Sequence, residues 1–453
     1  MTQHAPDDPG PTLDALAELA TLALAEARRL GASQAEVAAN DERGLNVNVR
    51  MGEVESVERT RDRGVAITVY FGKRKAQAST ADLKPESLKR TVEMACAIAR
   101  HTEEDPAAGL ADPERLARAP RDFDQWHPWP IEAEAAIELA LEAEAAGRAF
   151  DPRIRNADGA GVSTQAGLHV YANSHGFLGA EKSTSHSISV ALIAGEGEAM
   201  QGQHWYSAAL RAADLEPAAQ VGRKAAERTL ARLDPRPAPT GDIPGAVRAR
   251  GGAQPGGAPG GRGLGRGAVP QGQLPARRRG PAPVPALGAD PGASAPAAWL
   301  AQRRFRRRRR GHPRVAADRR WRARRAMCSA RYSARRLGLE STGNAGGVHN
   351  LEVAANAEGF DAMLKGMRRG LVVTELMGQG VNTVTGDYSR GAAGFWVEDG
   401  AIAYPVDELT IASNLRDMYA AIEAIGRDID PRSATAVGSV LVGRMTVAGG
   451  AGG

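Results

Sequence analysis

Two stretches decide the fold of this chain: Leu45-Asn-Val-Asn-Val-Arg50 and Gly64-Val-Ala-Ile-Thr-Val-Tyr-Phe71. In both, a large apolar side chain takes every second position. A strand with one buried and one solvated face has this period of two. Such alternation is typical of antiparallel rather than parallel sheets. The two stretches therefore predict half-buried strands of an antiparallel sheet.

Helical patterns flank these strands. Leucines and alanines recur at three- and four-residue steps over residues 12–30, and an apolar stripe that includes Cys96 runs over residues 88–99. Pro130 opens a third helix that continues through Leu141, and residues 215–233 form a fourth. Strands are also predicted at 169–171 and 188–193, with a turn at Asn173-Ser-His-Gly176 after the first of them.

The C-terminal part shows a similar mixture of elements. Strands are predicted near residues 371–376, 394–397, 402–404 and 440–448. The most regular helical pattern in the chain runs through Ile411, Leu415, Met418, Ile422 and Ile425, at steps of four, three, four and three. It predicts a helix between the last two strands.

A compositional break separates the two parts. Residues 245–331 contain 21 arginines, two acidic residues and no Ile, Thr, Tyr, Asn, Lys or Glu, and their net charge is +19. The other 366 residues carry −14, against +5 for the whole chain. One interpretation is a disordered arm whose arginines at 303–325 bind nucleic-acid phosphates. We favour a second one: Arg, Gly, Ala and Pro have codons beginning with two G or C bases, so a GC-rich gene translated out of register gives this composition.

The expected organisation therefore has three parts. Residues 1–240 form an N-terminal mixed helix and antiparallel-sheet domain, and residues 332–453 form a C-terminal β-rich domain. Residues 245–331 are a low-complexity, disordered-looking segment between them, in which no core can form. The fold class is α+β.

Composition excludes several classes of protein. Two cysteines, Cys96 and Cys328, cannot form a disulfide framework and fit a reducing compartment. The N-terminus lacks the features of a secretory signal, and no apolar run is long enough to span a membrane. We expect a cytoplasmic protein without a membrane partner.

Motifs for common hydrolase chemistry are absent from the sequence. None of the nine histidines is followed by Glu, so the helical His-Glu-x-x-His zinc site does not occur. There is no Gly-x-Ser-x-Gly elbow and no phosphate-binding loop ending in Gly-Lys-Ser/Thr. We expect neither a metal site nor a catalytic residue in this chain.

The most informative block is Gly370-Leu-Val-Val-Thr-Glu-Leu-Met-Gly-Gln-Gly380 followed by Thr385-Gly-Asp-Tyr-Ser-Arg-Gly-Ala-Ala-Gly394. Asp387, Tyr388, Ser389 and Arg390 are predicted to lie in a glycine-flanked turn, where another chain or a peptide could approach the backbone closely. The alternative is structural: Asp387 caps the turn, and Arg390 pairs with Glu375 or Glu398.

Several blocks resemble one known family. They are the two blocks just quoted, Gly438-Ser-Val-Leu441, and Ser333-Ala-Arg-Arg-Leu-Gly-Leu-Glu-Ser-Thr-Gly-Asn-Ala-Gly-Gly-Val-His-Asn350. They are similar to the PmbA/TldE subunits of the TldD/TldE metalloprotease family, once described as modulators of DNA gyrase. The likeness covers nearly the whole chain outside 245–331. It stops after Gly241-Asp-Ile-Pro244 and resumes at Tyr332, so the helix that corresponds to the metal-binding helix of TldD cannot be read here.

The resemblance implies a cytoplasmic heterodimer that cleaves unfolded peptides threaded between its subunits, with family roles in peptide-antibiotic maturation and antitoxin degradation. In such a pair the TldD-like partner holds the zinc through His-Glu-x-x-x-His and a cysteine. Near residues 436–438, where that cysteine would stand, this chain has no thiol. No cofactor is therefore expected in this chain. The residues expected to face the peptide channel or the partner are Asp387, Tyr388, Ser389, Arg390, Glu375 and His349.

Overall fold

The computed structural model describes residues 8–116, 123–248, 331–336, 338, 351–382, 385–430 and 435–449. His349, the arginines at 303–325 and most of the 245–331 segment lie outside these residues.

The N-terminal part is a six-stranded sheet in the order β3-β2-β1-β4-β5-β6, with every neighbouring pair antiparallel. The predicted alternation is present: Leu45, Val47, Val65 and Ile67 are all buried. The strands are β1 (Gln34–Arg50), β2 (Glu53–Phe71), β3 (Arg74–Thr80), β4 (Ile154–Asn173), β5 (Leu178–Ala194) and β6 (Gln201–Ala209).

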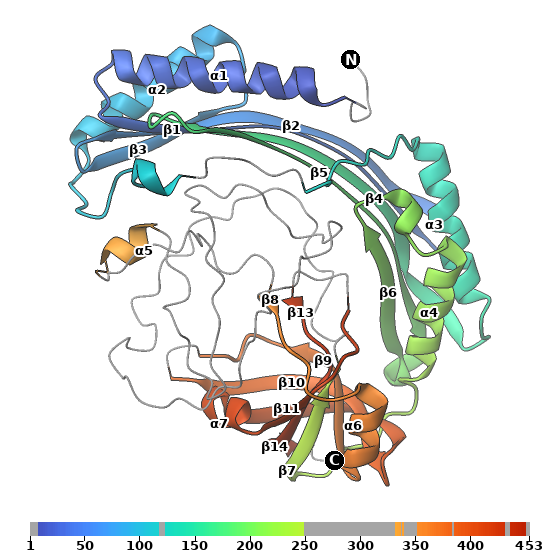
Figure 1. Ribbon diagram of the computed structural model, residues 1–453. Helices are drawn as coiled ribbons and strands as arrows, with labels where there is room; N and C mark the ends of the chain where they lie inside the picture. The colour runs from blue at the N-terminus through green and yellow to red at the C-terminus, as the bar shows by residue number, and fades with distance from the viewer. Residues whose placement is uncertain are drawn as a thin grey trace.

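Four helices cover the outer, convex face of this strongly curved sheet (Figure 1). The pair α1 and α2 packs over one end of the sheet, and the pair α3 and α4 packs over the other, which gives two separate cores on the same face. Cys96 is buried in the first core, as predicted. The helices are α1 (Gly10–Arg29), α2 (Pro85–His101), α3 (Ala133–Arg148) and α4 (Ala218–Leu230).

The C-terminal part is a second six-stranded sheet, β11-β10-β9-β7-β14-β12, which lies across from the concave side of the first (Figure 1). An additional pairing between β11 and β14 closes it into a barrel around Trp396, Leu409 and Ile411. Its strands are β7 (Gly241–Val247), β9 (Gly370–Met377), β10 (Asp387–Glu398), β11 (Ala401–Asn414), β12 (Ile422–Ile425) and β14 (Val440–Ala448).

Short elements complete the described chain. Helix α6 (Phe360–Met367) packs on the outside of the barrel through Phe360, Met363 and Met367. The others are 3₁₀ turns at Pro113–Arg115, Gly197–Ala199 and Ala212–Asp214, helices α5 (Arg331–Arg336) and α7 (Leu415–Ala420), and the two-residue strands β8 (Leu351–Glu352) and β13 (Thr435–Ala436). No helix among the described residues combines the length and apolar character that crossing a membrane requires.

The α+β class is confirmed, but two local predictions are wrong. The pattern from Ile411 to Ile425 is not one helix, because Ile411 lies in β11 and residues 422–425 form β12. Only α7 lies between them; the Asn414 side chain caps its N-terminus by accepting from the Arg416 N–H. The segments on both sides of α7 pair with β14 and bury Ile411 and Ile425, so strand pairing overrides the helical period.

The second wrong prediction concerns residues 387–390. They form the beginning of β10 rather than a turn.

Candidate functional site

Residues 387–390 line up along β10 with alternating exposure. Asp387 and Ser389 are exposed, whereas Tyr388 and Arg390 are half-buried. On one side this part of β10 pairs with β11, from Asp387 opposite Asn414 to Arg390 opposite Ile411. The four side chains predicted to act together are therefore neighbours on one strand, but they point to two different faces.

The other side of the same strand segment is covered by the chain itself. The Ser389 N–H donates to the Gly380 carbonyl at 2.7 Å, and the Asn382 N–H donates to the Asp387 carbonyl at 2.8 Å. A Cβ atom on Gly380 would collide with the Ser389 carbonyl oxygen. The close backbone contact expected here is therefore made by the 379–382 loop of the same chain. This loop occupies the edge of β10 to which a peptide strand would otherwise bind.

Asp387 ties the start of β10 to the cap of α7. Its Oδ2 accepts from the Thr385 hydroxyl at 2.5 Å, and its Oδ1 accepts from Asn414 Nδ2 at 3.4 Å. The same Asn414 side chain caps α7. The Asp387 carboxylate therefore stabilises local structure, which agrees with the structural role considered for it in the sequence analysis.

Among the described residues, Arg390 pairs with no acidic side chain, contrary to the other half of that alternative. Its guanidinium donates to the main-chain carbonyls of Leu376 and Met377 on β9, at 3.3 and 3.4 Å. Beside it, burial raises the pKa of Tyr388, and the neighbouring guanidinium opposes that shift only in part. Tyr388 is thus a neutral phenol that packs against the barrel core.

Glu375 lies where the two sheets meet. Its Oε2 accepts from Gln203 Nε2 of β6 at 3.0 Å, and its charge is one of those acting on Arg232. Glu398 accepts instead from the Trp396 indole N–H at 3.2 Å. The structure therefore places Glu375 at a contact between the two sheets.

The segment around residues 436–438 is closely packed. Ser439 is fully buried, and it donates to Asp428 through its N–H at 3.1 Å and its hydroxyl at 2.6 Å. A Cβ on Gly438 would collide with the Gly426 carbonyl. Among the described residues, no three His, Cys, Asp or Glu side chains are placed to hold one metal ion.

A hollow of about 530 Å³ opens next to this segment. The Arg248 guanidinium lies 4.4 Å above the Phe360 ring, and three carboxylates share the lining. No local pattern in the sequence predicts this hollow, because Arg248 lies more than a hundred residues before the rest of its lining. Its described lining is Arg248, Glu358, Gly359, Phe360, Asp361, Ala362, Asp428 and Ile429.

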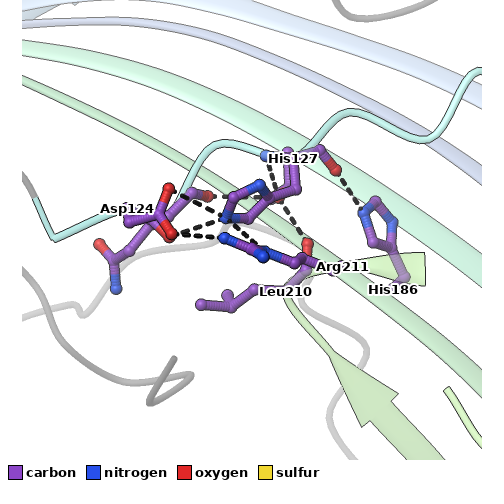
Figure 2. A network of polar contacts seen from close by, with 7 residues as sticks. Asp124, His127, His186, Leu210 and Arg211 are labelled. Carbon is purple, nitrogen blue, oxygen red and sulfur yellow. Dashed lines mark hydrogen bonds and ion pairs between the residues drawn. The ribbon is translucent and has the colours of Figure 1, made fainter. Parts of the chain in front are cut away.

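A third polar cluster crosses the edge of the N-terminal sheet (Figure 2). Arg211 donates through Nε to His127 Nε2 at 3.1 Å and through Nη2 to Asp124 at 2.5 Å. An aspartate beside a histidine is an arrangement that hydrolases use. Here the third member is a guanidinium and not a nucleophile, so the cluster fastens the 123–130 segment to the end of β6.

His186 lies beneath this cluster and is 1% exposed. Its Nε2 contacts the His127 carbonyl oxygen at 2.9 Å (Figure 2). Its Nδ1 contacts the Thr164 hydroxyl at 2.8 Å. Burial lowers its pKa, so the ring is neutral, with Nε2–H as donor and Nδ1 as acceptor. The role of this histidine is to order neighbouring segments.

The fold and the polar contacts define a class: a two-sheet α+β protein whose polar residues brace a closed C-terminal barrel. The chain belongs to the PmbA/TldD metallopeptidase family. Three family models match, described as PmbA/TldA metallopeptidase domain 1 at residues 35–99, the central domain at 126–233 and the C-terminal domain at 325–449.

Two curated relatives span nearly the whole chain. It is 41% identical over 435 residues to Metalloprotease PmbA of Escherichia coli O157:H7, with 92% of each chain covered. It is 36% identical over 456 residues to a Metalloprotease PmbA homolog of Haemophilus influenzae, with 96% of each covered. The similarity to these relatives therefore extends over almost the full length of the chain and is not confined to the blocks quoted above.

Solved structures share the fold. A candidate modulator of DNA gyrase from Bacteroides thetaiotaomicron superposes with a TM-score of 0.83 at 22% identity, over 95% of this chain and 98% of its own. TldE from Thermococcus kodakarensis gives a TM-score of 0.69 at 16% identity, over 94% and 99%. At these identities the likeness concerns the fold alone.

Proposed function

We propose that this chain is the PmbA/TldE-type subunit of a cytoplasmic, two-subunit metallopeptidase that cleaves unfolded peptides. In this proposal the zinc belongs to a TldD-like partner. The membership of the family supports the class of reaction, and the names of the relatives support the PmbA side of it.

The observation that carries the proposal is the packing around Ser439. Near residues 436–438, where the sister subunit would offer a cysteine ligand, this chain has no thiol, and Ser439 follows directly after this stretch. The Ser439 hydroxyl and N–H are both engaged by Asp428, and Gly438 fits directly against the Gly426 carbonyl. A metal ligand needs a donor atom that is free to bind the ion. The polar atoms of Ser439 are already hydrogen-bonded, so we assign this segment a structural role.

In this proposal the peptide substrate contacts side chains of β10 and not its main chain. Strand addition holds a peptide of any sequence through main-chain hydrogen bonds, but it needs an unpaired edge. The 379–382 loop occupies that edge at residues 387–390. Ser389 is therefore the group in this cluster that is best placed to reach a peptide, since it is exposed and its hydroxyl has no hydrogen bond to the described residues.

Metal analysis of the purified chain, alone and with a TldD-like partner, tests the proposal. We expect less than about 0.1 zinc per molecule of this chain alone, and about one zinc per heterodimer. Peptidase activity on an unfolded, fluorescently labelled peptide should need both subunits. Stoichiometric zinc in this chain alone, or peptidase activity without the partner, would refute it.

A further inference from the structure

Arg390 is a half-buried cation whose charge is not neutralised by any described residue. Its guanidinium donates only to the carbonyl oxygens of Leu376 and Met377, at 3.3 and 3.4 Å. Both distances exceed the range of about 2.7–3.2 Å in which N–H···O hydrogen bonds usually fall. A guanidinium has several further N–H donors, and those of Arg390 have no acceptor in the described part of the chain.

Other arginines that are withdrawn from solvent have a carboxylate beside them. Arg232 lies 3.2 Å from Asp407, and Arg61 lies 2.8 Å from the buried Asp41. A cation that leaves water without an anion next to it loses hydration and gains little in return. The open charge of Arg390 therefore indicates an anionic ligand that none of the described residues provides.

Two phenol hydroxyls lie at the same end of the barrel. Tyr388 precedes Arg390 by two residues and shares its face of β10, which sets the two side chains about 7 Å apart along the strand. Tyr419 belongs to α7, which begins directly after β11, where Ser413 pairs with Tyr388. The charges of Arg390 and Tyr419 both act on the pKa of Tyr388, so the three groups lie within electrostatic range of one another. Neither hydroxyl makes a hydrogen bond to a described residue.

These three side chains offer the donors that suit a carboxylate. A guanidinium binds a carboxylate through charge-assisted N–H donors, and a protonated phenol can donate to the same oxygens. Burial raises the pKa of Tyr388, so this phenol keeps its proton and remains a donor. Met377 is 38% exposed at the end of β9, where Arg390 contacts its carbonyl, and it offers an apolar contact to methylene groups next to a bound carboxylate. Ser389 lies on the other face of β10 and takes no part in this site.

We propose that Arg390, together with Tyr388 and Tyr419, binds a carboxylate group of the peptide substrate. The assignment rests on the proposed peptidase function, of which it names the substrate group that is recognised. A peptide carries this group at its C-terminus and on aspartate and glutamate side chains. Both sources present the same two oxygens, so the site alone does not distinguish them and the test peptides must.

Fluorescence anisotropy tests the site in the full-length chain, alone and with a TldD-like partner in the presence of EDTA to prevent cleavage. One labelled, unfolded and uncharged peptide sequence is used in three forms: with a free C-terminal carboxylate, with a C-terminal amide, and as that amide with one internal Gln replaced by Glu. We expect the free acid, the Glu peptide or both to bind at least about tenfold more tightly than the neutral amide, because charge-assisted hydrogen bonds are lost in the amide. Equal binding of the three forms, or binding of none, would overturn the proposal.

Variants assign the preference to these side chains. Arg390→Gln should abolish it, whereas Arg390→Lys should keep part of it, since an ammonium retains the charge but not the paired donors. Tyr419 is 44% exposed, so Tyr419→Phe should fold normally and weaken binding of the preferred form about threefold. Arg416→Gln, exposed on α7, is the matched control and should bind all three forms as the wild type does. If circular dichroism shows that Arg390→Gln is unfolded, Tyr419→Phe and the peptide comparison decide the matter.

Cleavage by the zinc-loaded pair separates this site from the proposed function. Arg390→Gln should raise KM for the preferred peptide about tenfold and leave kcat within about twofold, because it removes binding that the ground state and the transition state share. A pair that cleaves peptides without any carboxylate preference, or a preference that survives in Arg390→Gln, would overturn the assignment and leave the proposed function in place. A pair without peptidase activity would instead contradict the proposed function, whatever the anisotropy shows.

Discussion

A single buried carboxylate holds the turn between the first two strands of the N-terminal sheet. Glu144 is 1% exposed on α3, yet both of its oxygens are used by the turn between β1 and β2. Met51 in that turn has a φ of 54°, which a non-glycine residue seldom adopts without support. One carboxylate from a helix thus stabilises a strained turn ninety residues away.

Replacing Glu144 by Gln should loosen this turn. The amide keeps one acceptor oxygen but presents an N–H₂ group to the second backbone donor, at a cost of about 1–3 kcal/mol. Hydrogen exchange should show faster exchange of the Met51 and Gly52 amides, together with a lower thermal midpoint. Glu142→Gln, on the exposed side of the same helix, should change neither. Unchanged exchange at Met51 in the Glu144 variant would contradict this role.

His186 predicts a pH dependence of stability. Burial lowers its pKa below the ordinary 6.5, so the unfolded chain binds this proton more readily than the folded one. The stabilisation is therefore complete above about pH 6.5 and is lost as the pH falls below it, with a slope of up to about 1.4 kcal/mol per pH unit.

Thermal midpoints between pH 5.5 and 7.5 test this sign. The wild-type midpoint should fall more steeply on acidification than that of His186→Gln, which has no proton to gain. His101→Gln, at the exposed end of α2, should keep the wild-type slope. Parallel slopes for wild type and His186→Gln would rule out the buried imidazole as the cause.

At the level of elements, β10 shows how a loop can protect a strand. Residues 387–390 extend beyond the end of β9, and the 379–382 loop turns back to bond to them. A short strand end without this cover would present free main-chain groups to other chains.

Gly380→Ala should displace this loop. The added Cβ would meet the Ser389 carbonyl, a backbone atom that cannot move aside alone. We expect a loss of about 1–3 kcal/mol in the free energy of unfolding and rapid exchange of the Ser389 amide. Gly366→Ala in α6 is the matched control, because nothing lies within 4 Å of its new Cβ and alanine favours a helix. Equal behaviour of the two variants would show that the loop does not cover β10.

At the scale of the whole molecule, Arg232 joins the two sheets. It follows α4, and its side chain is only 3% exposed. Nη1 donates to the carbonyls of Gly394 and Val406 at 3.1 and 3.3 Å, and Nη2 lies 3.2 Å from Asp407. Burial lowers the pKa of this guanidinium, and Asp407 opposes the shift. The barrel is thereby fixed to the end of the helix pair on the first sheet.

Arg232→Met should partly uncouple the two sheets. It leaves two carbonyls and the Asp407 carboxylate without their partner, which costs about 3–5 kcal/mol for a buried pair. Calorimetry should show the single transition broadening or splitting into two. Arg223→Met, exposed on α4, should leave the transition unchanged. A sharp single transition at the wild-type temperature would exclude Arg232 as the link.

The sequence by itself determined the α+β class, the helices and antiparallel strands of the N-terminal part, the burial of Cys96 and the family. These features follow from the spacing of apolar residues and from short motifs, both of which involve residues that are close in the sequence. Only the tertiary structure decided that Ile411 and Ile425 belong to different strands and that residues 387–390 begin a strand. Each of these features depends on pairing with a strand that is distant in the sequence. That pairing provides the hydrogen bonds and buries the apolar side chains, and it forms only when the barrel closes.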